Sequence, residues 1–177
     1  MRWPFSPRRT PDRGAATIEM IYGTIVAQAR LPDFYADFGV PDTVNGRFDM
    51  VILHLWLVLR RLRALEAPAV AQRLFDHFCS DMDANLREMG VGDLAVPKRM
   101  TKFGEAFYGR SAAYERAAAS GHEAWCAALG RNILPDGAAA APLAAYAEHA
   151  LAALDQVDRN DFTSGNWLFP APVKVES

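Results

Sequence analysis

The stretch DMDANLREMGVGDLAVPKRMTKFGEAFYGR, residues 81–110, decides the fold of this chain. Before its central glycines, apolar residues recur every three or four positions, which is typical of one face of an α-helix. Gly90 follows the last of them, where a helix most readily ends in the left-handed conformation. Asp93 is a suitable N-cap, and Pro97 fits the first turn of a second helix. The stretch therefore predicts two helices joined by a short corner.

Arg110 interrupts the apolar face of the second helix, since it lies seven residues after Phe103 and three after Phe107. One interpretation is an arginine whose methylene groups cover the edge of the core while its guanidinium pairs with an acid. The alternative is an arginine that faces a groove and recognises a partner. The candidate acids for the first interpretation are Asp49, Asp81 and Asp83.

The rest of the chain shows the same helical spacing, with no sustained strand-like alternation and no internal repeat. We therefore expect an all-α fold, a single-domain bundle of six or seven helices. The helix over residues 46–66 carries two apolar rows and should be central, although Asn45-Gly46 at its start is also a strong turn signal. The predicted helices cover residues 16–29, 32–38, 46–66, 68–89, 96–120, 121–131 and 142–157.

The two ends of the chain differ in character. Residues 1–14 are rich in proline and arginine and are expected to form a disordered basic tail, which would leave residues 15–177 as the helical domain. Trp3 and Phe5 among these arginines are also compatible with contact to an anionic membrane surface or to RNA. Near the other end, Trp167, Leu168 and Phe169 should dock on the bundle.

Composition narrows the function classes. The 177 residues carry a net charge of −2, which argues against a general nucleic-acid binder. Two cysteines do not make a disulfide framework, and neither a signal peptide nor a transmembrane run is evident. The expected location is the cytoplasm, because two cysteines inside predicted helices suit a reducing compartment.

Catalytic motifs are absent from the sequence. It holds no glycine-rich phosphate loop and no GxSxG elbow, and no histidine follows a glutamate at the spacing of di-iron bundles. His122 and Cys126 stand four residues apart and could reach one zinc ion, but ordinary thiols and surface histidines are the favoured interpretation. We therefore expect no cofactor, no metal and no enzymatic activity.

A helical domain without catalytic motifs is more typical of a protein that binds other proteins. Met82, Met89 and Met100 near the helical corner suit contact with irregular apolar segments, although burial in the core is the simpler explanation for them. We expect a partner-binding groove where the helices over 46–66 and 96–120 approach. For His54 the alternative is a histidine at the edge of the core with a backbone or carboxylate partner. The candidate partner-binding residues are Arg47, His54, Lys98, Lys102, Tyr108 and Arg110.

Three segments resemble the ubiquinol–cytochrome c chaperone family. They are GVPDTVNGRFDMVILHLWLVLRRL at 39–62, the REMGVGD corner at 87–93 and FYGR at 107–110. The resemblance covers about residues 21–117, over half of the chain.

The resemblance implies a non-enzymatic assembly factor. Its client would be newly made cytochrome b, on the way into the ubiquinol–cytochrome c reductase complex of the respiratory chain. It also implies work near the ribosome and the membrane and, in relatives, a second small partner protein. The alternative is a peripheral membrane or ribosome adaptor without a chaperone role.

Overall fold

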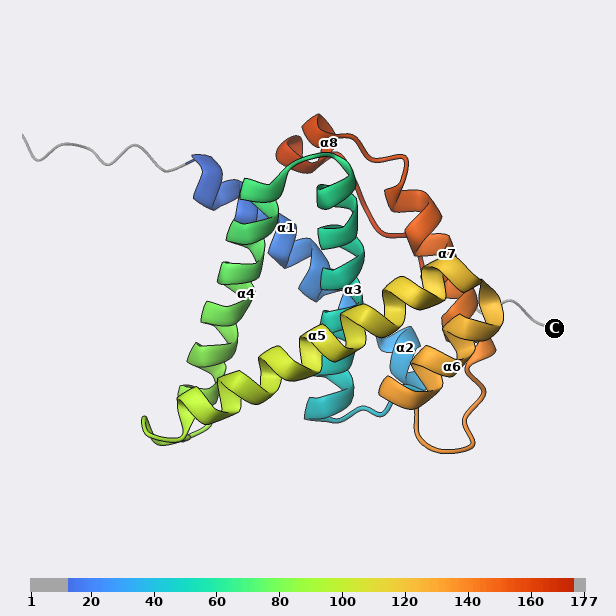
Figure 1. The fold of residues 1–177 in the computed structure, drawn as a ribbon, viewed down its shortest axis with the longest axis horizontal. Coiled ribbons are helices and arrows are strands. Elements are labelled where there is room, and N and C mark those ends of the chain that lie inside the picture. Colours follow the sequence, from blue (N-terminus) through green and yellow to red (C-terminus); the bar gives the residue numbers. More distant parts are fainter. Residues whose placement is uncertain (1–12, 174–177) are drawn as a thin grey trace, which may run out of the picture.

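The computed structural model describes residues 13–173, and this part of the chain is helical throughout, without strands (Figure 1). The expected all-α fold is confirmed. The six longer helices begin and end within three residues of the predicted bounds. A short helix starts at Pro32 as expected, whereas the short helix α8 is not predicted. The helices are α1 (Arg13–Ala29), α2 (Pro32–Ala36), α3 (Val44–Ala64), α4 (Pro68–Glu88), α5 (Val96–Ser120), α6 (His122–Asn132), α7 (Ala141–Leu154) and α8 (Arg159–Ser164).

The prediction of a disordered basic tail falls mainly on residues 1–12, which lie outside the described residues. Arg13 and Gly14, which were assigned to that tail, belong to α1 instead.

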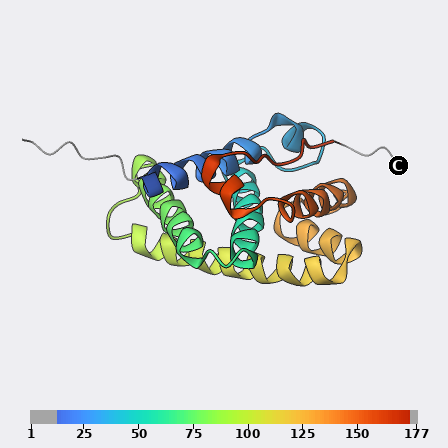
Figure 2. The ribbon, with the colours of Figure 1, turned by 90° about the horizontal axis from the view of Figure 1, so that it is seen from above.

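Helix α3 runs through the middle of the bundle and contacts α1, α4, α5 and α7. The α5 helix crosses in front of it, from the end of α4 to α6 and α7 (Figure 1), and Figure 2 shows α5 along one side of the molecule. The two apolar rows explain the central position of α3, because a helix that is apolar on most sides is stable only when covered on most sides. Ile52, Leu53, Leu55, Leu57 and Val58 have no exposed surface.

The start of α3 is fixed by a cap and a close backbone contact. The hydroxyl of Thr43 accepts a hydrogen bond of 3.1 Å from the backbone N–H of Gly46. Asn45 and Gly46 therefore lie in the first helical turn, and the turn signal read from the sequence is wrong. A Cβ atom on Gly46 would lie 2.0 Å from the carbonyl oxygen of Pro41, so only glycine fits here.

The corner between α4 and α5 closes as the sequence predicts. Gly90 has a φ of +79°, its N–H donates to the Arg87 carbonyl at 2.9 Å, and the Val91 N–H donates to the Leu86 carbonyl at 3.0 Å. These are the two hydrogen bonds of a Schellman motif.

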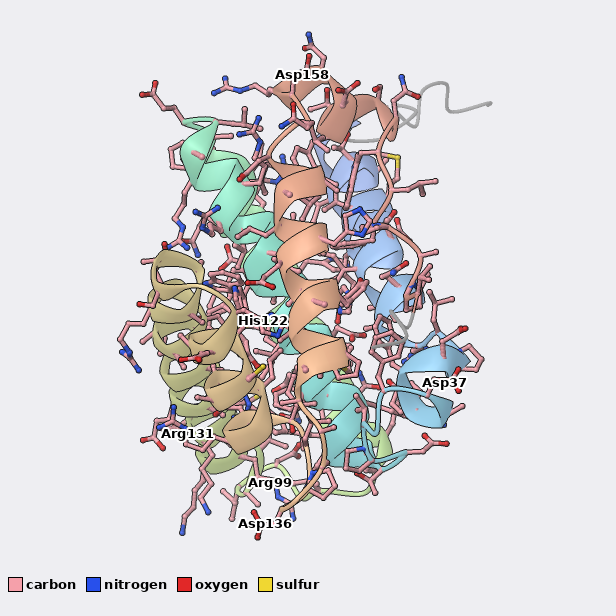
Figure 3. The ribbon with its side chains drawn as sticks, turned by 90° about the vertical axis from the view of Figure 1, so that its right-hand side faces the viewer. Asp37, Arg99, His122, Arg131, Asp136 and Asp158 are labelled. Atoms are coloured by element: carbon pink, nitrogen blue, oxygen red, sulfur yellow. The ribbon has the colours of Figure 1, made fainter. Side chains whose placement is uncertain are left out.

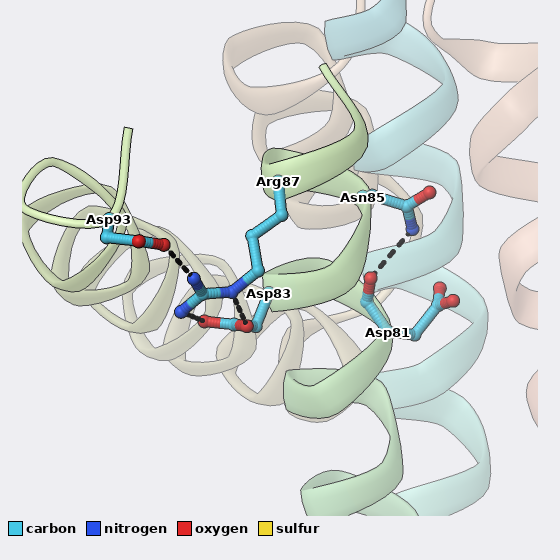
Figure 4. A network of polar contacts seen from close by, with 5 residues as sticks. All are labelled: Asp81, Asp83, Asn85, Arg87 and Asp93. Atoms are coloured by element: carbon cyan, nitrogen blue, oxygen red, sulfur yellow. Dashed lines mark hydrogen bonds and ion pairs between the residues drawn. The ribbon is translucent and has the colours of Figure 1, made fainter. Parts of the chain in front are cut away.

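Asp93 does not cap α5, because its carboxylate binds Arg87 instead, and Arg87 also holds Asp83 at 2.6 Å (Figure 4). The N-cap of α5 is Ala95, which makes no side-chain capping bond.

His54 is fully buried at the centre of a polar chain that joins four parts of the molecule. Its Nδ1 lies 2.8 Å from the Met50 carbonyl, which can only accept, so Nδ1 carries the proton. Its Nε2 then accepts from the hydroxyl of Tyr146 in α7 at 2.7 Å. Gln28 of α1 donates both to that hydroxyl, at 3.0 Å, and to the Pro170 carbonyl, at 2.9 Å. The alternative of a core histidine with a backbone partner is thus the one that the structure supports.

Asp49 and Arg110 join α3 to α5 through an ion pair of 2.7 Å, with 11% and 21% of their side chains exposed. Of the three candidate acids, Asp49 is therefore the partner. Burial raises the pKa of Asp49 to about 6, and the charge of Arg110 opposes this shift. The first interpretation of Arg110, an edge-of-core arginine paired with an acid, is confirmed.

The C-terminal segment docks as expected. Trp167 and Phe169 are buried, and the Phe169 ring centroid lies 4.9 Å from that of His54. Leu168 between them is exposed, because neighbouring residues of an extended segment point to opposite sides.

The contact at Gly46 gives a first prediction. Gly46→Ala should lower the free energy of unfolding by about 1–3 kcal/mol, because the new methyl group meets a backbone oxygen that cannot turn aside. Gly23→Ala is the matched control, since Gly23 lies in α1 with open space around its Cβ position, and it should stabilise by up to about 1 kcal/mol. Urea unfolding measures both, and an unchanged Gly46→Ala stability would contradict the close contact.

The burial of His54 predicts a pH dependence. Burial lowers the pKa of His54 from 6.5 to about 4, although the bond to Met50 opposes this. As the pH falls, the histidine of the unfolded chain takes up a proton before the buried one does. The stabilisation that neutral His54 contributes is therefore complete above pH 6.5 and is lost as the pH falls through 4. The advantage of the wild type over His54→Gln should shrink by about 2 kcal/mol between pH 7 and pH 4.5. The contribution of Asp49 to the free energy of unfolding changes with pH in the opposite direction, because burial raises its pKa. Urea unfolding must therefore compare the wild type with His54→Gln at each pH, so that the contribution of Asp49 cancels. A constant difference would refute the assignment.

The Asp49–Arg110 pair predicts strong coupling. Arg110→Met keeps the methylene packing but leaves Asp49 buried without a cation, and should cost about 2–3 kcal/mol at pH 7.5. The double variant Arg110→Met with Asp49→Asn should lose less than Arg110→Met alone, because no buried charge remains. Losses that simply add in urea unfolding would show that the two residues do not interact.

Candidate functional site

The six candidate partner-binding residues lie in different parts of the structure and do not form one site. His54 is in the core, which is incompatible with a place on a groove rim, and Arg110 is occupied by Asp49. Lys98 and Lys102 are exposed on the first turns of α5, and Tyr108 is exposed further along the same helix. Only Arg47 of the six lines the apolar groove described next. The physical reason is that His54 and Arg110 sit among apolar residues and must satisfy their polar atoms inside the bundle.

A groove of about 240 Å³ opens between the N-terminal part of α3, the end of α4 and the start of α5. We call it the corner groove. Its walls come mainly from α3 and α4, whereas α5 contributes only Phe103, so it is not simply the groove between α3 and α5 that was expected from the sequence. Its lining residues are Arg30, Val44, Asn45, Arg47, Phe48, Val51, Met82, Asn85, Leu86, Met89 and Phe103.

Three large apolar side chains on this end of the molecule are open to solvent. Val44 is 72% exposed, Met89 59% and Leu94 99%. Val44 and Met89 line the corner groove, and Leu94 lies in the loop between α4 and α5. Exposed apolar groups gathered at a rim are typical of surfaces that bind a partner. Sequence reasoning missed Val44, because the predicted helix begins after it. It noted Met89 but favoured a core position.

Aromatic rings line the groove between these exposed groups. The ring centroids of Phe48 and Phe103 are 4.8 Å apart, and Phe48 stacks on Phe78 at 6.3 Å. Phe48 and Phe103 are half-buried, so each keeps one part packed and one part accessible. This is a preformed apolar surface that a docking side chain can cover without first unfolding anything.

The edge of the groove near α1 is cationic. Arg30 and Arg47 line both the corner groove and an adjoining hollow of about 440 Å³ beside Tyr35. Arg47 pairs with Asp42 at 2.7 Å, and its guanidinium carbon lies 5.8 Å from the centroid of the Tyr35 ring. The hydrogen bond from Arg47 lowers the pKa of Asp42.

Tyr108 belongs to a different hollow, of about 320 Å³, on the opposite half of α3. It is lined also by Trp56, Phe75 and Phe107. The predicted site residues on α5 thus point to more than one place on the surface.

The corner groove offers binding rather than chemistry. No histidine, cysteine, aspartate or glutamate lines it. In the described residues, no three such side chains come together to hold a metal ion. Among helices of residues 13–173, none combines the length and the apolar character needed to cross a bilayer.

Comparison with solved structures gives a close match over nearly the whole chain. The crystal structure of the Cbp3 homolog from Brucella abortus superposes with a TM-score of 0.84 at 39% sequence identity, covering 96% of this chain and 97% of that one.

Curated relatives are more distant. Protein CBP3 of Saccharomyces cerevisiae mitochondria is 27% identical over 154 residues, which is 81% of this chain and 46% of that protein. The ubiquinol–cytochrome c reductase complex assembly factor 1 of Xenopus laevis is 24% identical over 116 residues, 64% of this chain and 58% of that protein. The human protein of the same name is 27% identical over 115 residues, 64% of this chain and 38% of its own length. This chain thus spans less than two thirds of each of these relatives.

The family model of the ubiquinol–cytochrome c chaperones matches residues 36–169, a region that holds the whole of α3 to α8 and all but one of the residues that line the corner groove. With this match and the Brucella abortus structure, the chain belongs to the ubiquinol–cytochrome c chaperone family.

Proposed function

We propose that this protein is a non-enzymatic assembly chaperone that binds newly made cytochrome b and supports assembly of the ubiquinol–cytochrome c reductase complex. The family match carries the proposal, because relatives over the same region are named assembly factors of that complex. Membership in a fold alone would not suffice, so the site must also suit the task.

The corner groove supports such a role physically. Cytochrome b is a membrane protein, and its apolar segments must be shielded until they are inserted. Val44, Met89, Phe48 and Phe103 offer an apolar surface to one short segment, and methionine side chains adapt to irregular shapes. Arg30 and Arg47 at the edge suit the acidic or carbonyl groups that flank such a segment.

Lys98 and Lys102 extend the cationic surface outside the groove, on the exposed side of α5. In this proposal they contribute to client approach rather than to tight contact, because exposed charges mainly raise association rates. We place the work of the protein at the cytoplasmic face of the inner membrane, where cytochrome b is inserted. The proposal also includes a second, small partner protein.

The test uses two exposed apolar groups of the groove. Val44→Glu with Met89→Glu should reduce the cytochrome b recovered with tagged protein from native cells by about tenfold, since two charges would be buried on binding. The fold should persist, because both side chains already face solvent. Leu168→Glu is the matched control: the residue is equally apolar and exposed, but it does not line the groove. The level of the mature reductase complex is measured in the same cells.

Full recovery of cytochrome b with the double variant, at unchanged melting temperature, would overturn the groove assignment. The function itself fails if the wild-type protein captures no cytochrome b and deletion of its gene leaves the reductase complex at its normal level.

A further inference from the structure

Two arginines stand where the corner groove meets the hollow beside Tyr35. Arg30 directly follows α1, and Arg47 lies in the first turn of α3. Each of them lines both cavities. Figure 3 shows α2, with Asp37 labelled at its end, near the start of α3, and side chains of both elements line the hollow. A group bound by these arginines therefore lies within reach of the apolar groove.

Arg47 is held in place before any partner binds. Its Nε donates to Asp42 at 2.7 Å, and its guanidinium carbon lies 5.8 Å from the centroid of the Tyr35 ring. That ring is fixed in turn, because its hydroxyl donates to the Ala29 carbonyl at 2.6 Å. In the described part of the chain, the two terminal nitrogens of Arg47 donate no hydrogen bond, so they remain available to a partner. Such preorganisation lowers the cost of binding.

Arg30 adds a positive charge that is not compensated. Its side chain is exposed and pairs with no acid among residues 13–173. Asp42 is the one acid among the residues that line the hollow, and Arg47 already neutralises it. A carboxylate is the group that best matches the remaining charge, because its hydrogen bonds to guanidinium groups are about twice as strong as those between neutral groups.

The corner groove is too small for a whole ligand. Its volume is about 240 Å³, whereas sites that enclose a small molecule measure roughly 300–1,000 Å³. It therefore suits one or two apolar side chains of a peptide rather than a lipid or a cofactor. On a helical peptide, side chains three or four positions apart are neighbours, with about 5–6 Å between their Cβ atoms. An acid one turn away from the side chains in the groove can thus reach the two arginines.

We propose that the client segment is amphipathic and acidic: its apolar side chains enter the corner groove, while an aspartate or glutamate one helical turn away is bound by Arg30 and Arg47. This inference rests on the proposed function and narrows it, from any apolar segment to one that carries a carboxylate at a set spacing. Apolar segments without that carboxylate leave the arginines unpaired and bind more weakly, which gives the groove its selectivity.

Short synthetic peptides that together cover the sequence of cytochrome b are the probe, and fluorescence anisotropy with the full-length protein measures their binding. The tightest binders should carry an acid three or four positions from an apolar residue. Exchange of that acid for its amide should weaken binding about tenfold, because charge-assisted hydrogen bonds are lost at unchanged shape. Arg30→Gln with Arg47→Gln should weaken binding of the acidic peptide by a similar factor and leave the amide peptide almost unaffected.

Lys98→Gln with Lys102→Gln is the matched control, since it removes the same charge from exposed positions of α5 outside the groove. It should slow association of both peptides but keep the tenfold preference for the acidic one. Arg30→Glu with Arg47→Glu should instead favour a peptide that has lysine in place of the acid. Circular dichroism checks that each variant remains folded.

The inference is overturned if the amide peptide binds as tightly as the acidic one, if Arg30→Gln with Arg47→Gln keeps the preference, or if no peptide binds. The proposed function is decided separately, by capture of cytochrome b from cells. A wild type that captures cytochrome b but shows no preference for the acidic peptide would therefore refute this inference alone.

Discussion

The hydrogen bond between the buried imidazole of His54 and the hydroxyl of Tyr146 is the constraint on which the bundle depends. A polar ring in the middle of α3 is costly unless both nitrogens have partners. The Met50 carbonyl provides one partner within the helix, but the other must come from α7. Gln28 then ties the same hydroxyl to α1 and to the C-terminal segment. One buried histidine thus fixes how four distant parts of the chain are placed.

Helix α5 is held differently, and this difference creates the groove. It packs mainly on α6, while the half-buried ion pair between Asp49 and Arg110 and the more exposed contacts of Glu115 with Arg60 and Arg63 join it to α3. At its other end, the Gly90 corner and the bridge from Arg87 to Asp83 and Asp93 set the angle at which it leaves α4 (Figure 4). Because α5 crosses α3 rather than lying along it, the start of α3 stays partly uncovered, and Phe48 and Phe103 line the resulting groove.

The segments that resemble the family therefore have structural reasons for their residue types. Gly46 admits the Pro41 carbonyl, Phe48 lines the groove, and Asp49 anchors α5. Arg110 at the end of the FYGR segment completes that anchor. Of these residues only Phe48 lines the groove, whereas Gly46 and the Asp49–Arg110 pair hold the helices around it in place. The exposed apolar surface of the groove comes from Val44 and Met89. A binding function without catalysis is consistent with this division, because the groove needs shape and apolar area more than reactive groups.

The sequence by itself determined the helices from α1 to α7, the central place of α3 and the Gly90 corner, because periodicity and glycine conformation are local properties. It also named Asp49 among three possible partners of Arg110. Only the tertiary structure chose that partner, placed His54 inside, and separated Lys98, Lys102 and Tyr108 from a common rim. It alone exposed Val44 and Met89 as well. Helical spacing tells which side of a helix is apolar, but not which neighbour covers it. The burial of His54 is decided by α7 and the C-terminal segment, and the open start of α3 by the way α5 crosses it, and all of these contacts join parts that are far apart in the chain.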